Sequence, residues 1–164
     1  TVELGLQTAH DSTARLINRG HDLARFTEGF NTARNAGLRI CVHIINGLPG
    51  ESTEMMLQTA EILGKMRPDG VKIHLLHVIK GTPLAGMYIS GEYTPMERES
   101  YIETVVKQLE YLPPETVIER LTGDGGRDSL LAPLWSLDKR AVLGGVMKRQ
   151  KQLDSIQGLR FQEG

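Results

Sequence analysis

Hydrophobic and polar residues alternate in three short stretches of the chain. These stretches are Val2–Leu6, Leu38–Ile45 and Val71–Val78. Alternation with a period of two is typical of a β-strand that buries one face. Because a helical pattern follows each stretch, we expect repeated βα units, a parallel sheet and right-handed crossovers.

Capping residues and prolines mark the helix starts between and after these strands. Thr94 precedes Pro95 and forms a capping-box pattern with Glu97, so we expect a helix to begin there and to end before Pro113. The tail after Leu153 has little pattern, and we expect it to fray. The other expected helix starts are Asp11, Asp22, Ser52 or Thr53, Thr82-Pro83 and Leu137, the last capped by Ser136.

The two faces of the expected strands differ in polarity. A doubly wound sheet has helices on both faces and would make both apolar, whereas a barrel has helices on one face only. The polar face therefore indicates a ligand cavity inside a barrel; the alternative is an exposed face of an open α/β fragment. The aliphatic face carries Val2, Leu4, Leu6, Leu38, Ile40, Val42, Ile44, Val71, Ile73 and Leu75. The polar face carries Glu3, Gly5, Gln7, Cys41, His43, Ile45, Lys72, His74 and Leu76.

Three parallel strands are too few to close a barrel. Because the chain begins within a strand, we expect it to be the second half of a barrel, with Val2–Leu6 at an open sheet edge. The expected fold class is α/β, with parallel βα units forming half of a partial (β/α)6 TIM-like barrel. We expect this half at residues 1–92 and a C-terminal α+β extension at 93–164, with a short strand at 116–123 and a loop at 132–136.

Composition adds few constraints. The 164 residues are 40% hydrophobic and 24% charged with a net charge of −1, which is ordinary for a globular protein and gives no overall attraction to nucleic acid or membranes. The basic run Lys139–Lys151 is better interpreted as a solvated helix face than as a binding patch.

Cys41 is the single cysteine and lies in an aliphatic run, which favours a buried small residue and a reducing compartment. Without a membrane-length apolar run or a signal peptide, we expect a cytoplasmic protein.

The second strand runs into a glycine-rich turn, "HIINGLPGES". Glycines allow close approach of the backbone to a ligand, and a helix N-terminus favours anions, but the turn alone is weak evidence for a site. The ordered set "ELGLQT", "LINRGH", "HIINGLPGE" and "HLLHVIKGTPL" resembles the C-terminal half of a radical S-adenosylmethionine (SAM) enzyme. The resemblance is to the YtqA/YhcC-like group, related to the elongator catalytic subunit and oxygen-independent coproporphyrinogen oxidase. It extends through "ERLTGD" and "APLWSLDK".

The resemblance implies that this chain supplies the fourth to sixth βα units of the barrel, with SAM across the carboxyl ends of the strands. It implies that Gln7 lies near the ribose and carboxylate of SAM and that Arg19 contacts the methionyl carboxylate. His43 stands where relatives often carry an aspartate that binds the ribose. Taken alone, these residues also fit a solvated strand end, a helix C-terminus and a core histidine.

The adenine-binding positions also follow from the resemblance. The turn beside the adenine corresponds to Gly47, Leu48, Pro49, Gly50 and Glu51. The strand whose backbone binds the adenine edge corresponds to Leu76, His77 and Val78. On the polar face, Glu3, Lys72 and His74 are candidates for lining the substrate cavity.

One feature of such enzymes is missing from the sequence. They hold a [4Fe–4S] cluster with a Cys-x3-Cys-x2-Cys motif and cleave SAM reductively to a 5′-deoxyadenosyl radical, whereas this chain has only Cys41. We therefore expect half a SAM site, no metal site and an inactive isolated chain. The resemblance implies the N-terminal barrel half, a reductant such as flavodoxin or ferredoxin, and tRNA as a possible substrate; no membrane partner is expected.

Two other functions stay open from the sequence. The chain could be a half-barrel module that binds a ligand or partner without radical chemistry. It could also be a different α/β enzyme that uses His43 or His74 as a base.

Overall fold

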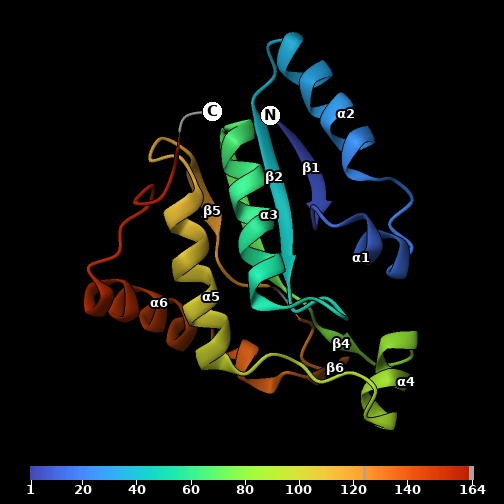
Figure 1. Cartoon of the computed structure of the whole chain (residues 1–164). Helices are drawn as coiled ribbons and strands as arrows, with labels where there is room; N and C mark the ends of the chain where they lie inside the picture. Colours follow the sequence, from blue (N-terminus) through green and yellow to red (C-terminus); the bar gives the residue numbers. More distant parts are fainter. Residues whose placement is uncertain (124, 163–164) are drawn as a thin grey trace.

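A four-stranded parallel sheet forms the centre of the computed structural model, which describes residues 1–123 and 125–162 (Figure 1). The strand order is β1-β2-β3-β5, so β1 lies at an edge, as expected. The strands are β1 (Val2–Gln7), β2 (Ile40–Asn46), β3 (Gly70–Leu75) and β5 (Val117–Arg120).

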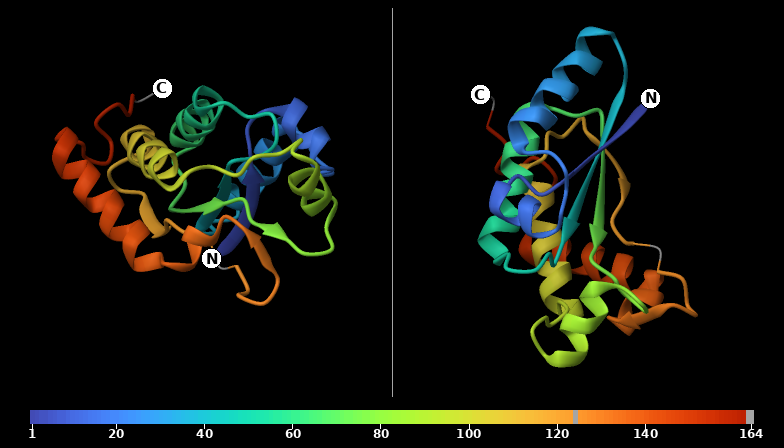
Figure 2. Two further views of the ribbon diagram at one scale, coloured as in Figure 1. Left: turned by 90° about the horizontal axis from the view of Figure 1, so that it is seen from below. Right: turned by 90° about the vertical axis from the view of Figure 1, so that its right-hand side faces the viewer.

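The helices around this sheet follow the expected βα alternation. They are α1 (Asp11–Leu16), α2 (Leu23–Asn35), α3 (Thr53–Met66), α5 (Arg98–Tyr111) and α6 (Lys139–Leu153). The right-hand view of Figure 2 shows α1, α2 and α3 on one side of the strands. A second, antiparallel sheet pairs β4 (Val78–Ile79) with β6 (Leu130–Ala132), next to α4 (Pro83–Ser90).

The aliphatic face of the strands packs under the helices, which confirms the predicted face assignment. Its core positions are Leu6, Ile40, Val42, Ile44, Val71, Ile73 and Leu75, packed with Phe30, Leu63, Tyr101 and Val105. Leu38 is the exception: it is 44% exposed because β2 begins only at Ile40. Burial of a large aliphatic side chain contributes about 1.5–3 kcal/mol, so the core fixes which face of each strand is turned away from the helices.

Three of the predicted helix caps are confirmed. The side chains of Asp22, Ser52 and Thr82 each accept a hydrogen bond from a backbone N–H of the first turn. The predicted start at Thr94-Pro95 is wrong, because α5 begins at Arg98. The residues before α5 form tertiary contacts instead: the Tyr93 hydroxyl donates to Gly47 O, and the carbonyl of Met96 accepts from the Trp135 indole.

Three other boundaries differ from the prediction. The strand expected at Val71–Val78 ends at Leu75, where the Leu76 N–H donates to Asn46 O and the chain turns toward the second sheet. The loop expected at 132–136 contains the end of β6 and a 3-10 helix, Leu134–Leu137. The last helix begins at Lys139 with Asp138 as its cap, because the Ser136 hydroxyl donates to Pro133 O.

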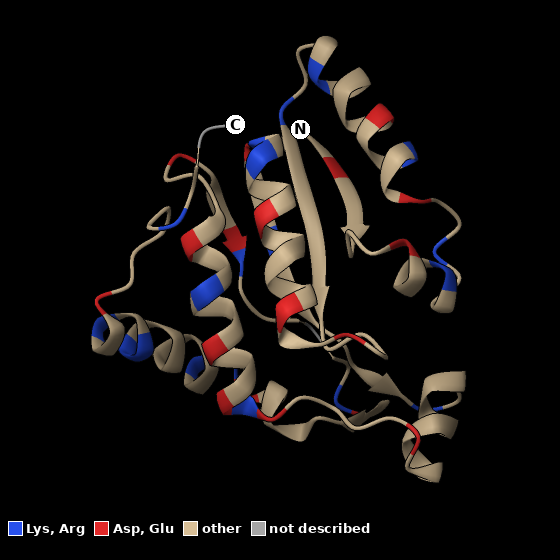
Figure 3. Cartoon of the chain, in the orientation of Figure 1, with Lys and Arg blue, Asp and Glu red and all other residues tan. Residues whose placement is uncertain are grey.

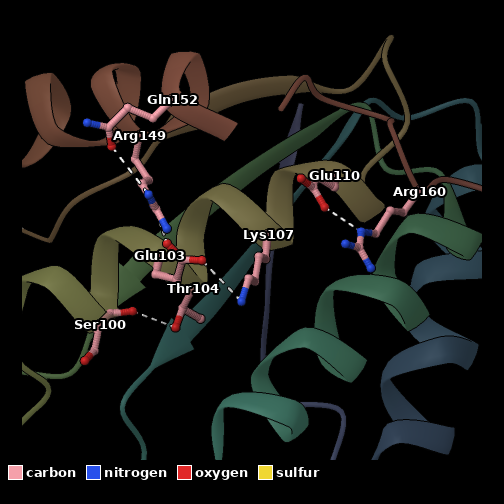
Figure 4. Close-up of polar contacts among 8 residues, drawn as sticks. All are labelled: Ser100, Glu103, Thr104, Lys107, Glu110, Arg149, Gln152 and Arg160. Atoms are coloured by element: carbon pink, nitrogen blue, oxygen red, sulfur yellow. Dashed lines mark hydrogen bonds and ion pairs between the residues drawn. The ribbon is translucent and has the colours of Figure 1, made fainter. Parts of the chain in front are cut away.

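The C-terminal region packs along α5 rather than fraying. Arg149 of α6 pairs with Glu103 at 2.6 Å, and Arg160 of the tail pairs with Glu110 at 2.6 Å (Figure 4). A Cβ at position 145 would lie 2.4 Å from the side chain of Ile102, so Gly145 permits the close contact between α5 and α6. Within the described residues, no helix combines the length and apolar character that crossing a membrane requires.

Candidate functional site

The polar residues of β1, β2 and β3 lie together on the sheet face opposite the core, called the open face below. In the parallel register Gly5 pairs with His43, His43 with Lys72, and Ile45 with His74. His74 therefore lies one step closer to the carboxyl ends of the strands than His43 and Lys72. The sequence predicted this grouping correctly.

Gln7 and Arg19 converge at the carboxyl end of β1. The register shifts between Gly5 and Gln7, and Gln7 takes a left-handed φ of 67°. Arg19 Nη2 donates to the Gly5 carbonyl at 2.6 Å. A Cβ on Gly5 would lie 2.5 Å from Gln7 Nε2 and 2.8 Å from Arg19 Nη2, so Gly5 creates the space that both side chains occupy.

A row of charges crosses the open face nearer the amino ends of the strands. Lys72 Nζ lies 2.6 Å from Glu3 Oε1 and 3.8 Å from Glu119. His43 Nε2 lies 2.8 Å from Glu3 Oε2, outside hydrogen-bond geometry. The hydrogen bond from Lys72 lowers the pKa of Glu3, and the same bond raises the pKa of Lys72. Both groups therefore stay charged across the neutral range.

Cys41 lies beneath this row and is fully buried. Burial, followed by the charge of Glu119, raises the pKa of its thiol to about 12. A thiol with this pKa is neutral and unreactive at neutral pH, in agreement with the predicted role as a small core residue.

His43 and His74 lie side by side on the neighbouring strands β2 and β3, with their rings tilted against each other. The rings of His43 and His74 lie 5.2 Å apart between centroids. Burial, and then the positive charges of His43, Arg120 and Lys72, lower the pKa of His74 to about 4. Burial and the charge of Lys139 lower the pKa of His77 as well. His74 and His77 are therefore neutral at pH 7.

Side chains from distant segments of the chain hold the glycine-rich turn after β2 in place. Gly47 and Gly50 have φ values of 84° and 79°, which glycine adopts without strain. Gly47 O accepts from the Tyr93 hydroxyl at 2.7 Å. The Asn46 side chain exchanges hydrogen bonds with Gln108, which is fully buried in α5.

Glu51 ties this turn to the β1–α1 connection. Its carboxylate accepts hydrogen bonds from the side chains of Thr8 and Thr13. Burial raises the pKa of Glu51 despite these hydrogen bonds. The carboxylate thus positions the turn through contacts within the chain.

Buried polar atoms without a partner are concentrated at this site. Among residues 1–123 and 125–162, these atoms are Gln7 Oε1, Arg19 Nε, His43 Nε2, His74 Nε2, His77 Nε2 and Ser155 Oγ. All but Ser155 belong to the residues that the sequence predicted for the site. An unpaired buried polar atom costs about 1–3 kcal/mol, so a ligand that pairs with these atoms would be favoured.

Sequence reasoning missed several residues that build the site. Gly5 carried a detectable signal, since a glycine inside a strand often marks a close approach of another group. Tyr93, Gln108 and Thr8 carried none, because their contacts depend on the tertiary fold. No cluster of three or more metal-ligating side chains occurs in the part of the chain that the structure describes.

Comparison with known proteins identifies the family. Residues 1–63 match the Radical SAM superfamily, and residues 68–152 match the Radical_SAM C-terminal domain. The chain therefore belongs to the radical SAM superfamily, as its sequence motifs indicated.

The relatives include bacterial and human proteins. The protein YtqA of Bacillus subtilis is 46% identical over 98% of this chain and 50% of its own length. Protein YhcC of Escherichia coli is 43% identical over 82% of this chain and 43% of its own length. Human Elongator complex protein 3 is 32% identical over 75% of this chain and 23% of its own length. The chain thus spans about half the length of the bacterial relatives.

A solved structure supports the same fold. The archaeal Methanocaldococcus infernus Elp3 with an N-terminal deletion superposes with a TM-score of 0.85 and 26% identity. The match covers 95% of this chain and 37% of the Elp3 chain. The α/β fold with a parallel sheet is therefore that of a radical SAM protein.

Proposed function

We propose that this chain provides the SAM-binding part of a radical SAM enzyme. Family membership defines the class, and one structural observation supports the site. Buried, unpaired polar atoms of Gln7 and Arg19 gather at the carboxyl end of β1, and His43 lies on the same face of the neighbouring strand. Ligands of parallel sheets bind at these ends.

The available atoms fit the polar groups of SAM. Gln7 Oε1 is an acceptor suited to an ammonium or hydroxyl group, and Arg19 Nε is a donor suited to a carboxylate. Arg19 is already oriented by its bond to the Gly5 carbonyl. His43 Nε2 can bond a ribose hydroxyl. We assign Gln7 and Arg19 to the methionyl end and His43 to the ribose.

The adenine would lie beside the turn at residues 47–50. Leu76 N–H is already used by Asn46 O, and Val78 pairs with Ala132 in the second sheet. The backbone groups that remain for the adenine edge are therefore the Leu76 carbonyl and those of His77. When SAM is bound next to a reduced iron–sulfur cluster, its reductive cleavage starts radical chemistry.

The cluster itself does not fit this chain. A [4Fe–4S] cluster needs several thiolates, and the sequence offers one buried thiol whose pKa is raised to about 12. We therefore propose that the cysteine ligands come from a further part of the protein or a partner. A flavodoxin or ferredoxin would supply the electron.

SAM binding measured by calorimetry tests the proposal. We expect Gln7→Ala and Arg19→Ala each to weaken SAM binding by about tenfold or more, the value of one lost hydrogen bond to a charged group. Arg140→Ala, an exposed position on α6, is the matched control and should bind SAM normally. Unchanged SAM affinity in both site variants would remove the assignment. SAM binding without any turnover in the complete protein would favour a binding module instead.

For the substrate, we propose a tRNA nucleotide. The similarity to Elongator complex protein 3 and the resemblance to enzymes that act on tRNA support this choice. The net charge of −1 adds no independent support. Mass spectrometry of nucleosides from the tRNA of cells with and without the gene tests it; identical nucleoside profiles would exclude it.

A further inference from the structure

We propose that the outer face of α6 binds the phosphate backbone of an RNA. The contacting side chains are Arg140, Lys148 and Lys151, called the basic stripe below. The inference rests on the proposed function only in taking this RNA to be the tRNA substrate. None of the three residues belongs to those assigned to SAM.

The charges of α6 have one sign. The helix contains five basic residues and no acidic one. The whole chain has a net charge of −1, so the rest of the chain is acidic overall. Figure 3 shows both signs on α2, α3 and α5 but only basic positions on α6. The other helices pair cations with carboxylates of the same helix: Arg25 with Glu28, Lys65 with Glu61 and Lys107 with Glu103. An ordinary solvated helix face, the interpretation that the sequence favoured, carries such mixed charges.

Three of the five cations are available to a ligand. Arg149 pairs with Glu103 at 2.6 Å (Figure 4), and Lys139 has a contact of its own. The residues of the basic stripe are exposed, and none of them forms an ion pair with any residue that the structure describes. Lys148 and Lys151 lie three residues apart on the helix and repel each other. An anion bound beside them would offset this repulsion.

The spacing of the stripe suits a nucleic-acid backbone. Arg140 and Lys151 are 11 positions apart in the sequence, which is about 16 Å along the helix axis. Because a strand carries one phosphate per about 3.4 Å of axis, this length covers about five phosphates. A groove of about 590 Å³ between α5 and α6 borders the stripe and is lined by Gly144 and Lys148. A Cβ on Gly144 would meet no atom within 4 Å, so the backbone of α6 is open to a ligand there.

The stripe begins on the side of the molecule where the main strands end. α6 follows β6, and β6 pairs with β4 directly after the carboxyl end of β3 (Figure 1). SAM is proposed to bind at the carboxyl ends of these strands. An RNA strand held along α6 therefore leads toward the edge at which the reaction would take place.

A polyanion fits the stripe better than a lipid surface does. Val142 and Val146 are buried in the core, so α6 has no continuous apolar face left to insert into a bilayer. Leu143 and Met147, which are 41% and 71% exposed, are the large apolar side chains of the helix that remain exposed. Lysine and arginine in a row contact successive phosphates without regard to base sequence. We choose RNA because the proposed substrate is a tRNA.

Fluorescence anisotropy of a labelled tRNA transcript, titrated with the chain at KCl concentrations between about 50 and 200 mM, tests the inference. We expect the logarithm of the binding constant to fall with the logarithm of the salt concentration with a slope of about −2 to −3, the value for three cations that each contact a phosphate. Phosphatidylglycerol vesicles and a polyglutamate peptide are titrated under the same conditions as competing partners. Binding of either one as tightly as the tRNA would overturn the proposal.

Charge-matched double variants locate the surface. Lys148→Gln with Lys151→Gln should weaken tRNA binding and make the slope shallower by about 1.5–2, whereas Lys148→Arg with Lys151→Arg should preserve both. Arg25→Gln with Lys65→Gln removes the same charge from exposed positions of α2 and α3 and should leave affinity and slope native. Equal effects of the two glutamine doubles, or no effect of either, contradict the proposal.

SAM affinity, measured in the same proteins, separates this inference from the proposed function. It should be native in all of these variants. SAM binding together with tRNA binding that does not depend on the stripe would refute this inference alone. Stripe-dependent tRNA binding by a chain that does not bind SAM would refute the proposed function alone.

Discussion

Gly5 determines the geometry of the proposed SAM contacts at the residue scale. In Gly5→Ala the new methyl group would overlap the ends of the Gln7 and Arg19 side chains, which are flexible, so the strand itself should remain in place. We expect stability to change by no more than about 1 kcal/mol, while SAM affinity falls about tenfold or more. Urea unfolding and calorimetry measure the two quantities.

Gly29→Ala on α2 is the control for this substitution. A Cβ there meets no atom within 4 Å, so the variant should bind SAM normally and gain about 0.5–1 kcal/mol in stability. A Gly5→Ala protein with native SAM affinity would show that the positions of Gln7 and Arg19 do not matter for binding.

Glu51 should make stability depend on pH. Because burial raises its pKa above the unfolded value, its contribution to stability is complete below the unfolded pKa and is lost as pH rises through the folded pKa. Glu51→Gln should therefore be at least as stable as the native protein at pH 7 and should show a flatter stability profile from pH 4 upward. Urea midpoints between pH 4 and pH 8 test this. Destabilisation by more than about 1 kcal/mol at pH 7 would show that the charged carboxylate is required.

The tail after α6 stabilises the end of α5 at the scale of elements. Gly158 N and Arg160 N donate to the carbonyls of Leu109 and Glu110, which lie in the last turn of α5. The Arg160 guanidinium also pairs with the Glu110 carboxylate, whose side chain is only 6% exposed (Figure 4). The absence of a periodic pattern after Leu153 predicted fraying, but these contacts come from a distant helix.

Arg160→Ala measures the value of this contact. The substitution leaves a buried carboxylate without its partner, so we expect a lower urea midpoint, and the exposure of Arg160 keeps this loss small. Adding Glu110→Gln should recover part of the loss, since it removes the unpaired charge. Urea unfolding of the single and double variants gives the coupling; a single variant as stable as the native protein would show that the tail contact contributes nothing.

How far the sequence predicts each element depends on its length. A period of two is visible over five or more residues, so the faces of the first three strands of the main sheet could be assigned. β4 and β6 have two and three residues, too few for a period, and they could not be found. The capping-box pattern at Thr94 predicted a wrong helix start, because Tyr93 and Met96 form hydrogen bonds with distant residues instead.

For the site, too, local patterns could be predicted from the sequence and tertiary contacts could not. Gln7, His43 and His74 could be placed on one face because strand parity is local. The bulges in β1 and β5 could not be foreseen, since they arise from the pairing of two strands. They decide how Gln7 lies over Gly5 and why Arg120 lies opposite Lys72.

At the scale of the whole molecule, the open face of the sheet and the sequence matches both support assignment of the chain to the radical SAM superfamily. The helices pack on the aliphatic side of the sheet, and the chain covers 50% of YtqA and 43% of YhcC. If the proposed function holds, SAM binding and radical generation are separable in this chain, because it carries the proposed binding groups and only one thiol.

This separation gives a direct prediction. Anaerobic reconstitution of the 164-residue chain with iron, sulfide and a reductant should give no stoichiometric [4Fe–4S] cluster, because its single thiol is fully buried and the raised pKa keeps it protonated. Under the same conditions SAM should bind but remain intact when followed by mass spectrometry. Iron and sulfide analysis of Cys41→Ala provides the control and should match that of the native chain. Close to one cluster per native chain, lost in Cys41→Ala, would show that copies of the chain share a cysteine site and would overturn the assignment of the ligands to another part of the protein or a partner.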